Sequence, residues 1–139
     1  MIGLFDAVAF AEYDDFSKRR VISWLGRRGL LVVDNTLFDR YAVDLLVGGV
    51  VPGDVEVRPD WVGESFPFGS VHVPERKRKF MGGDFLYFVL DRGMKRVLLT
   101  NGERILSSPL VSVKTWRGVD VFFDVPLSCF VCFDLDEVV

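Results

Sequence analysis

A carboxylate inside an apolar segment is the first feature of this sequence that indicates chemistry. Asp44 lies in residues 41–47, where valine and leucine surround it, and this segment is predicted to be a β-strand. A charged group in such surroundings is costly unless it is paired, hydrogen-bonded or bound to a metal ion. Asp44 is therefore a candidate metal ligand. The alternative is an acid at a strand end that reaches solvent or an arginine.

A second group of charged residues follows in residues 54–58, which are also predicted to form a strand. The period of two in a strand places Asp54, Glu56 and Arg58 on one face and both valines on the other. If the two strands pair, Asp44 and Glu56 approach each other across the ladder. Carboxylates on adjacent strands are suitable ligands for Mg²⁺ (or Mn²⁺), with water and a substrate phosphate completing the shell. A strand that faces solvent on one side has the same alternation.

The order of these features resembles the PD-(D/E)XK nuclease superfamily, which includes many restriction enzymes and Holliday-junction resolvases. A helix precedes an acid in an apolar strand, and a strand of the form Glu-X-basic follows, so that the resemblance covers roughly residues 12–80. It places Asp44 at the first acid of the family, Glu56 at the second and Arg58 where the family usually has lysine. It implies Mg²⁺-dependent hydrolysis of DNA phosphodiester bonds.

The arginine is the main departure from the family pattern. Arginine keeps its proton in proteins, whereas a lysine can orient water or help to activate it. Arg58 can still stabilise the charge of a phosphate transition state, or Lys77 or Lys79 can supply the ammonium from another element. The alternative is a non-catalytic module of the same fold that binds nucleic acid or a protein. A further alternative is an accessory protein whose C-terminal strands pair with another chain.

Two single residues are weaker candidates for the same site. Glu12 is a predicted accessory metal ligand on the first helix, where Asp14 and Asp15 compete for the role. His72 is the only histidine, and it is a candidate phosphate contact, although a single histidine is more often a structural hydrogen-bonding group.

The basic run after Pro74 is the predicted DNA-binding surface, because such clusters attract the phosphate backbone. Its members are Arg76, Lys77, Arg78 and Lys79. An ordinary solvated face has the same composition. In the preceding loop, Trp61, Phe66 and Phe68 are candidates to stack on bases or to anchor the loop on the core.

The predicted fold class is α/β (α+β), with a restriction-endonuclease-like mixed central sheet and extra C-terminal strands. A helix is predicted over 12–28, with Val21, Trp24 and Leu25 on one side, and a short helix over 74–80. The chain is expected to form one sheet in one domain, 1–139. Asn101-Gly102 predicts a hairpin between 96–100 and 104–106. The other expected strands are 30–33, 71–73, 85–90, 120–125 and 129–135.

Composition limits the classes of function. The chain has 139 residues and a net charge of −3, which does not by itself indicate a nucleic-acid binder. No apolar run is long enough to cross a bilayer, and two cysteines without an export signal predict a cytoplasmic protein. The expected partner is DNA, with no membrane. A homodimer is a candidate assembly, because cutting two DNA strands needs two sites.

Overall fold

The computed structural model describes residues 4–35 and 43–137, with side chains described from residue 14 onward. Its helical elements are α1 (Leu4–Arg27), the 3₁₀ helix η2 (Glu75–Phe80), α2 (Gly102–Leu106) and the 3₁₀ helix η3 (Leu127–Cys129). Its strands are β1 (Val32–Asp34), β2 (Leu45–Val47), β3 (Val51–Val57), β4 (Ser70–Pro74), β5 (Leu86–Leu90), β6 (Arg96–Asn101), β7 (Leu110–Thr115), β8 (Gly118–Pro126) and β9 (Val131–Asp134).

The strands form two sheets. Sheet A has six strands in the order β1-β2-β3-β5-β6-β9, and sheet B has three in the order β4-β8-β7. In sheet A only the central pair, β3 and β5, is parallel, and every other neighbouring pair in either sheet is antiparallel. The chain is thus a mixed α/β protein of the α+β kind, with few helices, as the sequence predicted at that level.

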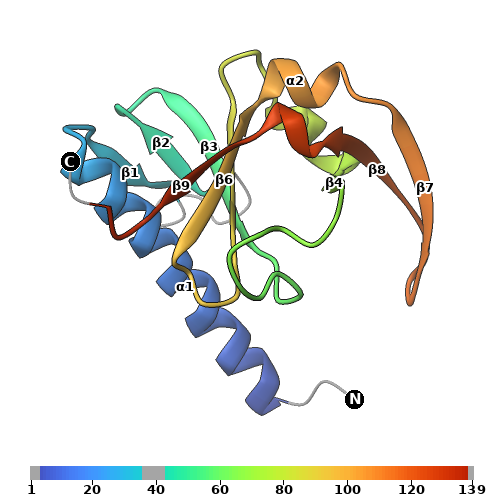
Figure 1. Ribbon diagram of the computed structural model, residues 1–139, viewed down its shortest axis with the longest axis horizontal. Coiled ribbons are helices and arrows are strands. Elements are labelled where there is room, and N and C mark those ends of the chain that lie inside the picture. The colour runs from blue at the N-terminus through green and yellow to red at the C-terminus, as the bar shows by residue number, and fades with distance from the viewer. Residues whose placement is uncertain (1–3, 36–42, 138–139) are drawn as a thin grey trace.

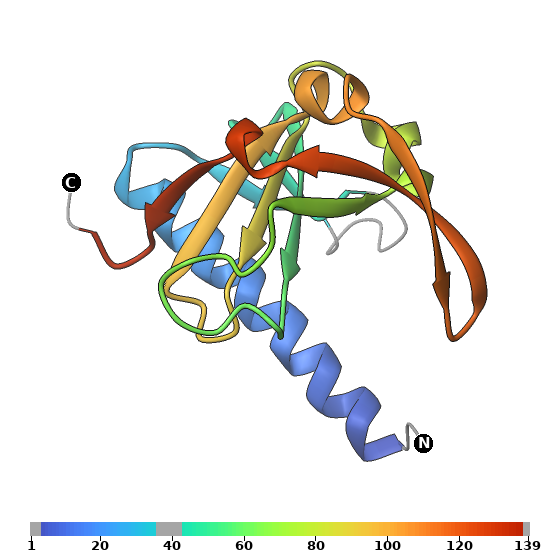
Figure 2. The same cartoon turned by 45° about the vertical axis from the view of Figure 1, so that its right-hand side comes forward.

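Sheet A is the middle of three layers. Helix α1 covers one of its faces and sheet B lies on the other, as Figures 1 and 2 show. Strand β5 and the residue before it explain this arrangement. Phe85, Tyr87 and Val89 enter the core toward sheet B, whereas Phe88 and Leu90 enter the core toward α1. A strand that is buried on both faces needs this uninterrupted apolar run.

Helix α1 packs through the side that the sequence predicts. Val21, Trp24 and Leu25 are buried against sheet A, at the i, i+3 and i+4 spacing of one helical face. The Trp24 ring lies 5.2 Å from that of Phe133 on β9, so the helix also holds the edge of the sheet. The observed helix begins earlier than the predicted residue 12.

The prediction of one continuous sheet is wrong. Strand β8 pairs with β4 and not with the strands of sheet A, and β7 follows it at the free edge. Pro126, at the end of β8, is followed by η3, and the chain then returns to sheet A as β9. Proline cannot donate a ladder hydrogen bond, which suits the change of sheet at this position.

The predicted hairpin at Asn101-Gly102 is also wrong. Asn101 instead caps the short helix α2, and its side-chain oxygen accepts a hydrogen bond from the Arg104 backbone nitrogen at 3.0 Å. Gly102 donates to the Phe85 carbonyl at 2.7 Å, and a Cβ atom at this position would stand 2.0 Å from the Gly82 carbonyl oxygen. The glycine therefore permits a close approach of two backbones.

Among the described residues, no helix combines the length and the apolar character that crossing a bilayer requires. The predicted second helix over 74–80 is the 3₁₀ helix η2. It begins directly after Pro74, the last residue of β4, and brings the basic run to the end of sheet B.

Candidate functional site

Two aspartates meet at the β2–β3 hairpin. Asp44 lies in a bend directly before β2, and not in the middle of a strand as predicted; residues 41 and 42 lie outside the described part of the chain. The Asp44 backbone nitrogen donates to Asp54 Oδ1 at 2.9 Å, and the Val55 nitrogen donates to Asp44 Oδ2 at 2.9 Å. Each carboxylate is therefore held by one backbone N–H group.

The neighbour of Asp44 is Asp54, where the prediction had Glu56. The hairpin pairs Leu45 with Gly53 and Val47 with Val51, so the next position beyond Leu45 faces Asp54. Glu56 lies two residues further along β3. A hairpin centred on Gly49 would have indicated this pairing from the sequence, because Asp44 and Asp54 are equally distant from that glycine.

A lysine approaches each of the two acids from a different element. Lys18 of α1 places its Nζ 3.5 Å from Asp44 Oδ1 and 3.1 Å from Asp14 Oδ2. Lys77 of η2 places its Nζ 2.7 Å from Asp54 Oδ2. We call Lys18, Asp44, Asp54 and Lys77 the paired-acid site. It joins the first helix, the hairpin and the basic run.

Both carboxylates are largely shielded from solvent. Asp54 is 3% exposed. Burial, and after it the charge of Asp54, raise the pKa of Asp44 to about 6, although the hydrogen bond from the Val55 N–H and the charge of Lys18 act to lower it. Burial also lowers the pKa of Lys18, but the charges of Asp44 and Asp14 outweigh this and leave it raised. Asp44 therefore binds a proton more readily than an ordinary exposed aspartate does.

Glu56 and Arg58 belong to a second network on the same face of β3. Glu56 accepts a hydrogen bond from the hydroxyl of Tyr87 and lies 3.5 Å from Arg58 Nε. Burial raises the pKa of Tyr87 well above its usual value, and the charge of Glu56 adds to the effect. Arg58 Nη2 donates to the His72 carbonyl, which links β3 to β4 of sheet B. Arg58 thus contacts Glu56 and a backbone oxygen.

The basic run divides into one site residue and three outer ones. Lys77 reaches Asp54, whereas Arg78 lies 3.3 Å from Glu75 and over the ring of Phe123. Lys79 lies over the Phe80 ring, and Arg76 is exposed. Of the two lysines that the sequence leaves as alternatives, it is Lys77 that contacts an acid of the paired-acid site.

The remaining predicted residues lie elsewhere or outside the described part. The His72 side chain stacks on Phe122 and places Nε2 3.3 Å from Asp124 Oδ1, so its ring turns toward β8. The Glu12 side chain lies outside the residues whose side chains are described. Of its predicted competitors, Asp14 contacts Lys18 and Asp15 pairs with Arg19 at 3.2 Å.

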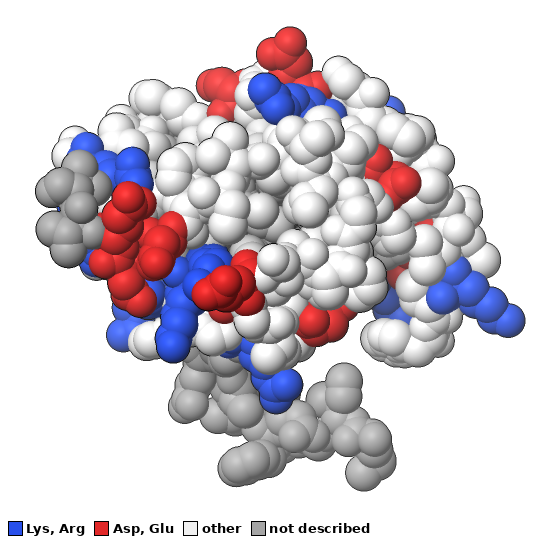
Figure 3. Space-filling model, in the orientation of Figure 1, with Lys and Arg blue, Asp and Glu red and all other residues white. Residues whose placement is uncertain are grey.

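Arg20 of α1 and Arg28, which follows the helix, contact residues of the C-terminal segment. Arg20 donates to the Met94 carbonyl and to Asp136, and Arg28 lies 3.7 Å from Glu137. Figure 3 shows basic and acidic side chains side by side over α1 and this C-terminal segment. These cations are therefore partly neutralised by the chain itself.

Asp44 and Asp54 are the residues of the paired-acid site that could hold a divalent cation of the hard type. Mg²⁺ commonly uses one or two carboxylates and keeps several waters for the remaining positions. Asp44, in the bend before β2, and Asp54, on β3, supply two carboxylates, each fixed by a backbone N–H group. Within residues 14–35 and 43–137, no three His, Cys, Asp or Glu side chains gather as a larger metal cluster. A cation here would therefore need water and a bound phosphate as its remaining ligands.

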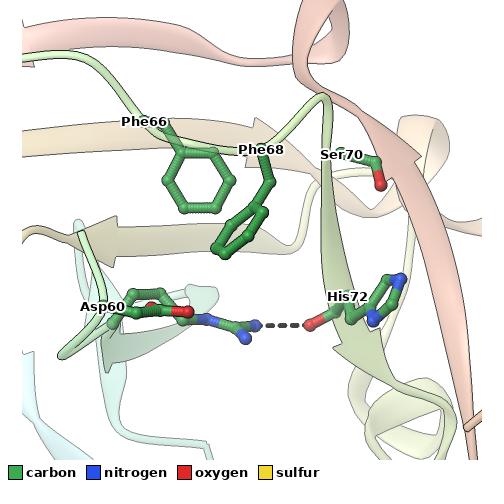
Figure 4. A pocket seen from close by; sticks show the side chains of 6 residues that line it. Asp60, Phe66, Phe68, Ser70 and His72 are labelled. Carbon is green, nitrogen blue, oxygen red and sulfur yellow. Dashed lines mark hydrogen bonds between the residues drawn. The ribbon is translucent and has the colours of Figure 1, made fainter.

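A pocket of about 330 Å³ opens beyond the far end of the same strand face. Arg58, Asp60, Phe66, Phe68, Ser70 and His72 line it. Figure 4 shows the two phenylalanine rings pointing from the loop toward Asp60, with Ser70 and His72 across from them on β4. The sequence singled out the aromatic loop but not the cavity that it forms with β4 and with the residues that follow β3.

Comparisons of the chain with models of known families, with curated proteins and with solved structures gave no match. The function that follows therefore rests on the chemistry of these residues.

Proposed function

We propose that the chain is a metal-dependent nuclease that hydrolyses DNA phosphodiester bonds on a restriction-endonuclease-like sheet. The observation that carries the proposal is the pair of acids at the β2–β3 hairpin. Asp44 and Asp54 are linked through hydrogen bonds of 2.9 Å and lie between two lysines. Raised acid pKa values are typical of functional sites, and Asp44 has one.

In this proposal Asp44 and Asp54 hold a Mg²⁺ or Mn²⁺ ion. Such an ion, when bound, polarises a phosphoryl oxygen and lowers the pKa of the attacking water. The backbone nitrogens of Asp44 and Val55 orient the two carboxylates. The Lys77 ammonium, 2.7 Å from Asp54, complements the negative charge that develops on the phosphate. Arg58 stays protonated and donates to the His72 carbonyl, so it acts outside the paired-acid site.

Plasmid cleavage tests the proposal. The wild-type chain is expected to nick supercoiled DNA in Mg²⁺ or Mn²⁺ and to leave it intact in EDTA. Asp44→Asn and Asp54→Asn are each expected to lower the cleavage rate at least about a hundredfold, because removal of a preorganised charged group costs about that much. Asp15→Asn is the matched control, since Asp15 is an exposed acid paired with Arg19 and is expected to retain wild-type cleavage.

Mn²⁺ binding separates the two possible acid pairs. Glu56→Gln is expected to bind Mn²⁺ as tightly as the wild type, whereas Asp54→Asn loses that binding. The reverse result would assign the second ligand to Glu56, as the family resemblance implies. Cleavage that persists at the native rate in Asp44→Asn would refute the nuclease proposal.

A non-catalytic module that binds nucleic acid or a protein is the second candidate, and one observation favours it. Lys18 and Lys77 already neutralise the two acids, at 3.5 Å and 2.7 Å, so the site is electrostatically complete without a metal ion. In that case Mg²⁺ leaves the melting temperature unchanged and no metal-dependent product forms. A ligand that binds only the folded chain would instead raise the melting temperature.

A further inference from the structure

A pocket opens after the end of β3, and none of its lining residues belongs to the paired-acid site. Its volume of about 330 Å³ falls at the lower end of small-ligand pockets, which span about 300–1,000 Å³. Arg58 comes directly after β3 and continues the alternation of Asp54 and Glu56, so an extended chain places the pocket roughly 13 Å from Asp54. A nucleic acid strand held at the paired-acid site therefore has the pocket within reach.

Aromatic rings form one wall of the pocket. Phe68 is 52% exposed, and its ring lies 5.7 Å from that of Phe66 in an edge-to-face contact. Phe66 in turn contacts the fully buried Trp61 in the same way, at 5.6 Å. The inner rings thus anchor the loop on the core, while Phe68 presents apolar surface to the cavity (Figure 4). An exposed aromatic with an anchored neighbour is suited to stacking.

Polar groups of both kinds form the opposite wall. Arg58 is a permanent donor, and its bond to the His72 carbonyl keeps the guanidinium at the junction of the two sheets. Asp60 is an exposed acceptor in the same pocket. Flat heterocycles with donors and acceptors at their edges fit such a lining, because their faces stack while their edges form hydrogen bonds.

We propose that this pocket binds an unpaired nucleobase of the DNA strand that passes the paired-acid site, with Phe68 as the stacking ring. The inference rests on the proposed function in taking a nucleic acid strand as the ligand. In a duplex the faces of the bases are covered by their neighbours, so only an unpaired or extruded base can enter a pocket of this kind. The substrate then has a single-stranded segment next to the bond that is cleaved.

Fluorescence anisotropy in EDTA tests this without cleavage. The probes are a labelled oligothymidylate, a strand of the same length with abasic residues, and a duplex of the same length. The wild-type chain is expected to bind the oligothymidylate about tenfold more tightly than the abasic strand, because stacking of one base contributes about that much. Both strands carry the same phosphate charge, so the difference isolates the bases.

Variants of Phe68 separate stacking from packing. Phe68→Leu keeps an apolar side chain and is expected to lose about tenfold in affinity for the oligothymidylate. Phe68→Trp keeps a stacking ring and is expected to retain the wild-type affinity. Phe16→Ala is the control, because Phe16 is an aromatic of α1 with a similar exposure of 48%. The affinity of the duplex is expected to stay the same in all three variants.

Three results would overturn the inference: equal binding of the normal and abasic strands, an unchanged affinity in Phe68→Leu, or no binding of any strand. These outcomes are independent of the plasmid assay. A chain that binds the oligothymidylate through Phe68 but never cleaves DNA would refute the nuclease and leave the base pocket in place.

Discussion

At the scale of single residues, the ionised form of Asp44 lowers the free energy of unfolding. Burial and the neighbouring Asp54 raise the pKa of Asp44 to about 6, from an ordinary value of 3.8. Between these two values the folded chain binds a proton that the unfolded chain has released. Ionisation of Asp44 therefore opposes folding, and stability falls as the pH rises from about 4 through about 6.

Asp44→Asn tests this linkage, since the amide cannot ionise. As the pH rises from about 4 to about 7, the wild type is expected to lose about 1–3 kcal/mol of unfolding free energy relative to the variant. Urea denaturation of both proteins in EDTA, across this range, measures the difference. A difference between the two proteins that stays constant with pH would contradict the raised pKa.

Lys77 is the second residue whose removal has a calculable effect. It lies 2.7 Å from Asp54, a carboxylate that is 3% exposed, so Lys77→Met leaves a buried charge without its partner. The expected cost is about 3 kcal/mol of unfolding free energy, measured by urea denaturation at neutral pH. Lys79→Met is the matched control on the same helix, with an exposed lysine and an expected change below about 0.5 kcal/mol. Equal effects of the two variants would show that the Lys77–Asp54 contact contributes nothing.

At the scale of elements, the start of α2, which stands where a hairpin was expected, allows a prediction about stability. A Cβ atom at Gly102 would stand 2.0 Å from the Gly82 carbonyl oxygen and 3.2 Å from the Phe85 Cβ. Gly102→Ala is therefore expected to cost at least about 2 kcal/mol, since one of the two backbones must move. Gly83→Ala is the control, because nothing lies within 4 Å of its Cβ position. Thermal denaturation followed by circular dichroism compares them, and equal midpoints would disprove the close approach.

Local sequence signals predicted some elements and missed the features that depend on which strands pair and in which register. The spacing of Val21, Trp24 and Leu25 predicted the buried side of α1, and the apolar run 85–90 predicted β5. The second sheet was missed, because the pairing of β4 with β8 joins segments that are distant in the chain. The acid pair depends in the same way on register. Both Asp54 and Glu56 lie on one face of β3, and only the hairpin register selects Asp54 as the neighbour of Asp44.

At the scale of the whole molecule, β5 joins the two cores. Its residues alternate between the core beside sheet B, which includes Val89 and Trp61, and the core beside α1, which includes Leu90 and Trp24. A side chain lost from one core therefore loosens a strand that the other core also requires. We expect the two cores to unfold together, as a single cooperative transition.

Single-tryptophan variants measure this coupling, because Trp24 and Trp61 report on different cores while Trp116 is 89% exposed. One background keeps Trp24 alone and the other keeps Trp61 alone, with phenylalanine at the other two positions. Val89→Ala removes buried apolar volume from the core of Trp61 and is expected to cost about 2 kcal/mol. The loss should be equal in both backgrounds, because β5 transmits it to the core of Trp24. Val119→Ala, at a side chain that is 69% exposed, should change neither. If Trp24 fluorescence keeps its original urea midpoint in Val89→Ala while Trp61 fluorescence shifts, the two cores unfold independently and β5 does not couple them.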